Sequence, residues 1–206
     1  MNRTFLIFLM IGSAMLIAVI GQQKPTIQHD YAPWDVITTE NGAIQVFGMT
    51  PGKTTIKESK QILSKASETQ LLIAGNKNQQ RQLIAIHKDL MISGLLSELR
   101  LAYQLEQNTL NELYSTLDIK PEAPGMEKSY SITPELEEFY SSTPIASITY
   151  IPSINYGEEV ILQRFGTPTE ERVISDTERQ WHYPEIGLEI QLYSNQAERF
   201  IYSNPK

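Results

Sequence analysis

Short apolar runs alternate along the chain with clusters of turn residues, a pattern typical of strands in antiparallel sheets. In the clearest run, Leu99, Leu101 and Tyr103 alternate with polar neighbours, which places their side chains on one face of a strand. The dipeptide Asn41-Gly42 is a strong turn signal between two such runs. The runs that predict strands in the first half of the chain are residues 34–38, 43–47, 70–74, 82–86 and 98–104.

Helical spacing of apolar residues replaces this alternation elsewhere. We expect a helix over residues 51–66, with Thr50 as its N-cap and Pro51 as its first residue. Proline is suited to that position because the hydrogen bond it cannot donate is not made there in any helix. A second helix is expected over residues 105–117, and a short acidic helix over residues 134–142.

The second half of the chain repeats this order of elements. A helix is expected over residues 158–165, and it ends at Gly166, a glycine C-cap that is followed by Pro168. Residues 81–92 align without a gap on residues 179–190, although the repeat rests on element order more than on identities. The strands expected around this helix are residues 146–151, 172–175, 181–183, 188–193 and 199–202.

These elements predict an α+β fold class. An N-terminal transmembrane helix is expected to precede two repeats, each a helix plus a three-stranded antiparallel sheet. The two repeats are expected to pack against each other. The expected segments are a membrane anchor or signal at 1–21, a linker at 22–33, repeat 1 with a trailing helix at 34–117, a connector at 118–143 and repeat 2 at 144–206.

The N-terminal segment is the strongest single signal in the sequence. Residues 4–21 carry no charge and form a run longer than a usual signal-peptide core and slightly shorter than the roughly 20 residues that span a bilayer. The positive charge of Arg3 favours the cytoplasmic side of the membrane. We therefore expect a single-pass inner-membrane protein whose chain after Gly21 lies in the periplasm. Cleavage after Gly21 would instead release a soluble exported protein, but the site is weak, which favours an uncleaved anchor.

Composition narrows the function classes. The 206 residues include 17 basic and 24 acidic ones, a net charge of −7, without the basic cluster that nucleic acids require. The chain has no cysteine, so disulfides, thiolate metal sites and lipid attached through cysteine are excluded. We therefore expect neither nucleic acid nor a cysteine nucleophile in the function.

The stretch FGMTPGKTT, residues 47–55, resembles a phosphate-binding loop but does not meet its requirements. Only three residues separate Gly48 from Gly52, where the motif needs four, and Pro51 lacks the N–H that the phosphate cradle uses. A helix start at Thr50 and Pro51 explains the stretch more simply. No nucleotide partner is predicted.

No catalytic or metal-binding motif is visible. His29, His87 and His182 form no H-x-x-x-H or H-E-x-x-H pair, and no serine lies in a G-x-S-x-G turn. We therefore predict a protein that is not an enzyme, with no cofactor and no metal. Trp181 and Tyr183 are candidate partner-facing aromatic residues, although packing within a half-buried sheet accounts for them more simply.

The Gly48-Met49-Thr50 stretch, the segment GEEVILQRFGTP at residues 157–168 and the following Trp181-x-Tyr183 together resemble the SmpA/OmlA type of small envelope protein. That family includes the small lipoprotein subunit of the outer-membrane β-barrel assembly machine, and it shares its fold with β-lactamase inhibitor proteins. The resemblance covers residues 144–204 and, more loosely, residues 43–104. It implies a non-enzymatic, protein-binding role. The lipidated cysteine usual in bacterial members is absent.

The sequence thus predicts a membrane-anchored, extracytoplasmic protein-binding module of the bacterial cell envelope that does no catalysis. Its expected partners are another envelope protein and, through residues 4–21, the membrane. The alternative, if the signal is cleaved, is a secreted inhibitor-like protein that binds a hydrolase.

Overall fold

The computed structural model describes residues 28–29, 31–75, 80–117 and 127–205. Ten of the described strands form one sheet, in which all neighbours are antiparallel except β1 (Gln28–His29), which runs parallel to β5. In spatial order the other strands are β7 (Lys128–Ser131), β4 (Glu68–Ile73), β5 (Arg81–Ile92), β6 (Leu95–Tyr103), β8 (Ile145–Pro152), β12 (Arg199–Tyr202), β11 (Leu188–Tyr193), β10 (Glu178–Tyr183) and β9 (Glu170–Ser175).

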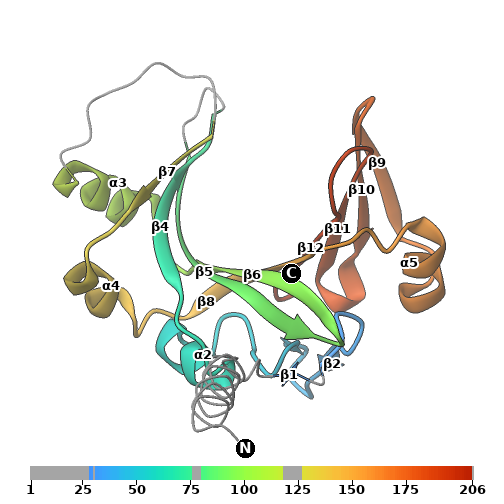
Figure 1. Cartoon of the computed structure of the whole chain (residues 1–206), viewed down its shortest axis with the longest axis horizontal. Helices are drawn as coiled ribbons and strands as arrows, with labels where there is room; N and C mark the ends of the chain where they lie inside the picture. The colour runs from blue at the N-terminus through green and yellow to red at the C-terminus, as the bar shows by residue number, and fades with distance from the viewer. Residues whose placement is uncertain (1–27, 30, 76–79, 118–126, 206) are drawn as a thin grey trace, which may run out of the picture.

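The sheet bends into a trough (Figure 1). Strands β4, β5 and β7 rise on one side of the trough, β9, β10 and β11 rise on the other, and β6 and β8 cross between them. The described helices and the small hairpin of β2 and β3 lie outside the trough, against its convex face. These outer elements are β2 (Ile37–Thr38), β3 (Ile44–Gln45), α2 (Ile56–Ile62), α3 (Gln107–Thr116), α4 (Pro134–Tyr140) and α5 (Glu158–Phe165); the 3-10 turn η1 (Pro184–Ile186) joins β10 to β11.

The predicted fold class is wrong. The chain is mainly β, and a single sheet runs through both segments that the sequence divided into repeats. Strands β6 and β8 join the two halves by pairing from Ser97 opposite Pro152 to Tyr103 opposite Ile145, with one shift of register between Ala102 and Tyr103. The aligned segments also differ: residues 81–92 form one strand, whereas residues 179–190 turn back on themselves between β10 and β11. Strand pairing depends on partners far away in sequence, so element order alone did not reveal the single sheet.

The predicted membrane protein also needs correction. Within the described residues, no helix has the length and apolar character needed to cross a membrane. This does not support the predicted transmembrane helix or the predicted single-pass inner-membrane location. The proposed anchor at residues 1–21 lies outside the described residues.

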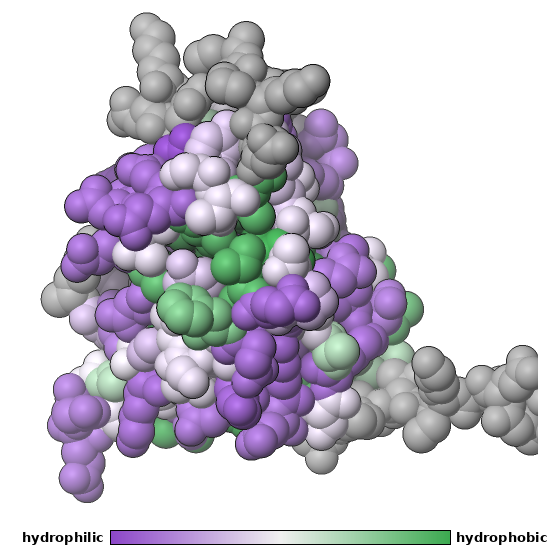
Figure 2. Space-filling model, turned by 90° about the vertical axis from the view of Figure 1, so that its left-hand side faces the viewer, coloured by the Kyte–Doolittle hydropathy of each residue, from purple (hydrophilic) through white to green (hydrophobic). Residues whose placement is uncertain are grey.

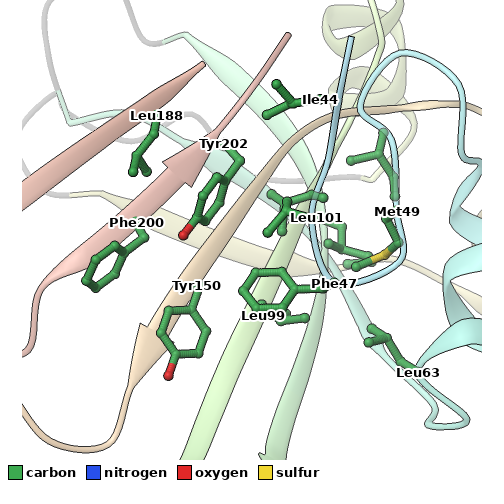
Figure 3. Packing of buried hydrophobic residues seen from close by; sticks show 14 of the residues in the cluster. Ile44, Phe47, Met49, Leu63, Leu99, Leu101, Tyr150, Leu188, Phe200 and Tyr202 are labelled. Atoms are coloured by element: carbon green, nitrogen blue, oxygen red, sulfur yellow. The ribbon is translucent and has the colours of Figure 1, made fainter. Parts of the chain in front are cut away.

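A single hydrophobic core joins the two halves of the sheet to the helices. Phe47, from the loop after β3, lies with its ring against Tyr150 of β8 and Tyr202 of β12, at centroid distances of 5.5 and 5.9 Å (Figure 3). All three side chains are at most 1% exposed. The hydroxyl of Tyr202 donates to the carbonyl of Pro33 at 2.6 Å, which fixes the incoming chain on the same core.

The FGMTPGKTT stretch makes hydrogen bonds to residues that are far away in the sequence. Phe47 and Gly48 turn at φ 52° and 74° between the paired residues Val46 and Met49, so the glycine takes a conformation that suits it. The Gly52 N–H donates to the Ile145 carbonyl at 2.6 Å. Asn204 donates to the Pro51 carbonyl at 2.6 Å. The loop thus attaches α2 to β8 and to the C-terminal end of the described chain.

The predicted start of the first helix requires a further correction. Helix α2 begins at Ile56, and Thr55 is its N-cap. The Thr55 hydroxyl accepts the Glu58 N–H at 3.2 Å, while the Glu58 carboxylate accepts the Thr55 N–H at 2.8 Å. This reciprocal capping box satisfies two helix donors at once, which Thr50 and Pro51 could not do. Thr50 instead lies in the preceding turn.

Helix α5 has the predicted bounds, but a distant residue caps it. Gly157 is its N-cap residue and has no side chain to offer, and the N–H groups of Tyr156 and Gly157 donate to Glu198 at 3.2 and 3.0 Å. At the other end, Gly166 has φ 77° and ψ −168°, a region that essentially only glycine occupies. Pro168 follows in the connection to β9.

The flank formed by α3 and α4 carries hydrophobic side chains within a mainly hydrophilic surface (Figure 2). Helix α4 contacts α2 through the ion pair of Lys60 and Glu137, at 2.5 Å, and that of Lys57 and Glu138, at 3.4 Å. Phe139 of α4 is 77% exposed. Hydrophobic side chains that are partly buried against the core in this region are Leu105, Leu117, Ile132, Leu136 and Tyr140.

Candidate functional site

The two faces of the sheet have opposite environments. Along most strands of the sheet, alternate residues point to the convex side and enter the core, although all six residues of β9 are exposed. The intervening residues form what we call the open face, inside the trough. Cross-strand pairing shows one continuous row of open-face residues over eight strands. That row is Glu68, Ile86, Arg100, Thr149, Ile201, Glu189, His182 and Glu170.

A small apolar cluster lies within the open face. Ile84, Ile86 and Ala102 are between 3% and 6% exposed, and partly buried Leu72 and Ala146 pack against them. This cluster is separate from the main core on the other side of the sheet. In the described chain, no helix packs over it.

Two hollows on the open face meet at a pair of arginines. One has a volume of about 470 Å³ and the other about 240 Å³, and Arg100 and Arg199 line both. We call the two hollows together the central groove. Its apolar lining residues are Leu72, Ile84, Leu96, Ala102, Ile151, Pro152, Ala197 and Ile201. Its charged lining residues are Lys88, Asp89, Glu98, Arg100, Glu127 and Arg199.

Polar side chains of the open face hold one another in place along the strands. The Arg100 Nε donates to Glu98 at 2.5 Å, two residues away on the same face of β6. On β11, the Tyr193 hydroxyl donates to Gln191 at 2.8 Å, and Gln191 donates to Glu189 at 2.9 Å. Such pairing fixes rotamers before any partner arrives, which lowers the entropy lost on binding.

The structure places the predicted partner-facing aromatic residues in the core. Trp181 and Tyr183 are 3% and 4% exposed and point to the convex side of β10. The Tyr183 hydroxyl donates to the Gly166 carbonyl at 3.0 Å and so holds the end of α5. Neither side chain is available to a partner. The interpretation as sheet packing fits these two residues.

The histidines lie in three separate strands. His29 is in β1. His182, on the open face, has its Nδ1 3.8 Å from Glu189. His87 is fully buried on the core side, where burial and the charge of Lys60 lower its pKa to about 4. Across the residues that the structure describes, no group of three or more His, Asp or Glu side chains is placed to hold a metal ion.

Neither ring nitrogen of His87 makes a hydrogen bond with another described residue. The backbone of Lys65 favours the charged ring, and so does Glu137, but both effects are smaller than that of burial. His87 is therefore a neutral core residue that is costly to protonate. It lies on the face of the sheet away from the central groove.

No protein-family model, curated protein or solved structure matches this chain. Only the residues of the central groove themselves therefore indicate what it binds.

The sequence contained part of the information about the groove. Leu99, Leu101 and Tyr103 were correctly assigned to one face of a strand, and all three are in the core. Arg100 must then lie on the opposite face. The sequence did not show that this opposite face would be concave and uncovered, since that depends on how the whole sheet bends.

Proposed function

We propose that this protein is a non-catalytic protein-binding module that receives a partner protein in its central groove. The observation that carries the proposal is a concave open face with a buried apolar cluster, at which two hollows converge. Protein interfaces combine an apolar centre with polar surroundings and frequently use arginine. The groove has this composition, with Ile84 and Ala102 beside Arg100 and Arg199.

Two further points support protein binding over a small-molecule site. The hollows are shallow depressions shared by many strands, and their polar groups are spread along the sheet. A small-molecule site would bring a few polar groups together in an enclosed pocket. The resemblance of residues 157–168 and 181–183 to SmpA/OmlA proteins also favours a binding role.

The experiment is a pull-down with the full-length chain tagged after Lys206, compared between two variants. Thr149→Trp inserts a bulky ring at the middle of the open face, between Arg100 and Ile201. Thr167→Trp makes the same change at an exposed position beyond α5, outside the groove. The unchanged chain and Thr167→Trp are expected to capture the same protein in stoichiometric amount, and Thr149→Trp to lose it.

Circular dichroism and melting curves would first establish that both variants fold as the unchanged chain does. A partner that Thr149→Trp retains would show that binding uses another surface. Failure of the unchanged chain to capture any protein would contradict a binding role under the conditions used.

A further inference from the structure

We infer that the central groove selects an extended polypeptide segment with a carboxylate near its middle, and that Arg199 is the residue that binds this carboxylate. The inference rests on the proposed function and specifies the chemistry of the partner. It follows from the position of Arg199, from the absence of an acidic partner for it among the described residues, and from the distribution of charge along the groove.

Arg199 is central because it lines both hollows of the groove. It projects from β12, opposite Gln191 of β11, onto the open face. A segment that occupies both hollows must therefore pass this side chain. Ile151 and Ile201 lie nearby on the same face and offer apolar contacts to the residues on either side.

Arg199 differs from the other cations around the groove. Arg100 is paired with Glu98 at 2.5 Å, and Lys88 with Glu68 at 2.9 Å. Arg199 has no ion pair with any residue that the structure describes; its guanidinium lies 5.5 Å from the centre of the Tyr193 ring. Its N–H donors are thus free to take a carboxylate, the group that arginine binds with two parallel hydrogen bonds.

Each hollow also has an acidic residue that the other lacks, with Lys88 beside the one in the larger hollow. Asp89 lines only the larger hollow and Glu127 only the smaller one. A ligand with negative charge all along its length, such as a nucleic acid, would meet both acids as well as a chain of net charge −7. A segment with a single acidic residue in its middle and neutral or basic ends fits this pattern.

An extended shape follows from the form of the site. The groove crosses several strands and shows no deep pocket for a bulky folded element. An extended segment of nine residues spans about 30 Å, enough to pass through both hollows. Its alternate side chains would face the apolar floor.

The test is a selection from a display library of random nonapeptides on the immobilised full-length chain. Four proteins are compared: the unchanged chain, Arg199→Gln, the groove-blocking Thr149→Trp, and Arg172→Gln as a matched control. Arg172 is an open-face arginine on β9 that is paired with Glu170 and does not line the groove. Selected peptides are remade with the central acid replaced by its amide, and affinities are measured by fluorescence anisotropy.

The expected result is enrichment of peptides with an acidic residue between apolar ones. Replacing that acid by its amide, or Arg199 by Gln, should each weaken binding about tenfold or more. The two changes together should cost little more than either alone, because they remove the same contact. Arg172→Gln should bind as the unchanged chain does.

Two other results would overturn the inference, with different consequences. Peptides that lose binding in Thr149→Trp but show no preference for an acid would refute the role of Arg199 and leave the groove as the binding site. An absence of any peptide whose binding depends on Thr149 would refute the inference together with the proposed use of the groove.

Discussion

The two faces of the sheet are made by the same strands but differ in how deeply their side chains are buried. On the convex side, residues such as Leu101, Tyr150 and Phe200 are fully buried in the main core, which contains side chains from both halves of the sheet and from the helices. On the open face, their immediate neighbours Arg100, Thr149 and Ile201 remain partly exposed. Adjacent residues of one strand therefore differ in role: one supports the fold, and we propose that the other serves recognition.

This comparison indicates where mutations should act. Loss of a convex-side residue leaves a cavity in a closely packed core, and the free energy of unfolding falls accordingly. Loss of an open-face residue removes few contacts within the chain, so its effect should be seen in binding. The core side also contains buried polar residues, among them His87 and Glu198, which are 0% and 4% exposed.

The largest effect is expected from a pair of neighbours on β12. Phe200→Ala should lower the free energy of unfolding by about 3–5 kcal/mol, as is usual for a buried phenylalanine. Ile201→Ala, the next residue on the opposite face, should cost only about 1 kcal/mol. Urea denaturation of the two variants measures both. Similar losses would mean that the open face is as closely covered as the core.

The next largest effect is the pH dependence of the free energy of unfolding that His87 causes. Because its folded pKa of about 4 lies below the ordinary value of 6.5, the unfolded chain takes up a proton first as the pH falls. Stability should therefore decline between pH 6.5 and about 4, by about 3 kcal/mol in total from this group. The charges that face it are Lys60, Lys65 and Glu137.

The matched variant is His87→Leu, which cannot be protonated. The unfolding free energies of the two proteins are measured from pH 7.5 to 4. The stability of His87→Leu relative to the unchanged chain should rise by about 3 kcal/mol over this range, because only the unchanged chain loses stability through protonation of this group. Parallel curves would show that the His87 ring is hydrated or hydrogen-bonded in solution.

A smaller effect on stability is expected at Glu198, another buried polar residue on the core side. Glu198→Ala leaves the N–H groups of Tyr156 and Gly157 without their acceptor and should cost about 1–3 kcal/mol. Glu198→Gln keeps one acceptor oxygen and should cost less. Thermal unfolding compares the two variants. Equal melting temperatures for the unchanged chain and Glu198→Ala would mean that water replaces this distant cap at no cost.

The smallest effect on stability is expected on the open face itself. Arg199→Gln should change the free energy of unfolding by no more than about 0.5 kcal/mol, since the side chain makes no ion pair with a described residue. Thermal unfolding of this variant, set beside Phe200→Ala, compares two successive residues of one strand. A large loss for Arg199→Gln would assign that arginine to the fold.

Much of the secondary structure could be predicted locally. Helix α5 at residues 158–165 and strands β11 and β12 have the expected bounds. Gly166 ends the helix, and turn residues lie at the ends of the two strands. Strand β7 was missed, since Lys128–Ser131 has no apolar alternation and is held by its pairing with β4. The sequence also did not predict that Thr55 caps α2, where Thr50 was expected, or that Glu198 caps the start of α5.

The candidate site could be predicted only in part, for a related reason. Alternation assigned Arg100 and Leu101 to opposite faces, but it could not say which face helices would cover. The groove also needs Arg199 of the last strand beside Arg100 of β6. Their proximity arises because β12 inserts between β8 and β11, next to the centre of the sheet.

By itself, the sequence determined most of the short-range features: the majority of the strands, the bounds of helix α5, and which side chains of a strand share a face. These depend on dihedral preferences and on apolar periodicity within a few residues. The tertiary structure alone decided the order of the strands, the single sheet through both halves, the burial of Trp181 and Tyr183, and the concave open face. These features arise from pairing and packing between distant segments, whose free energy no local pattern records.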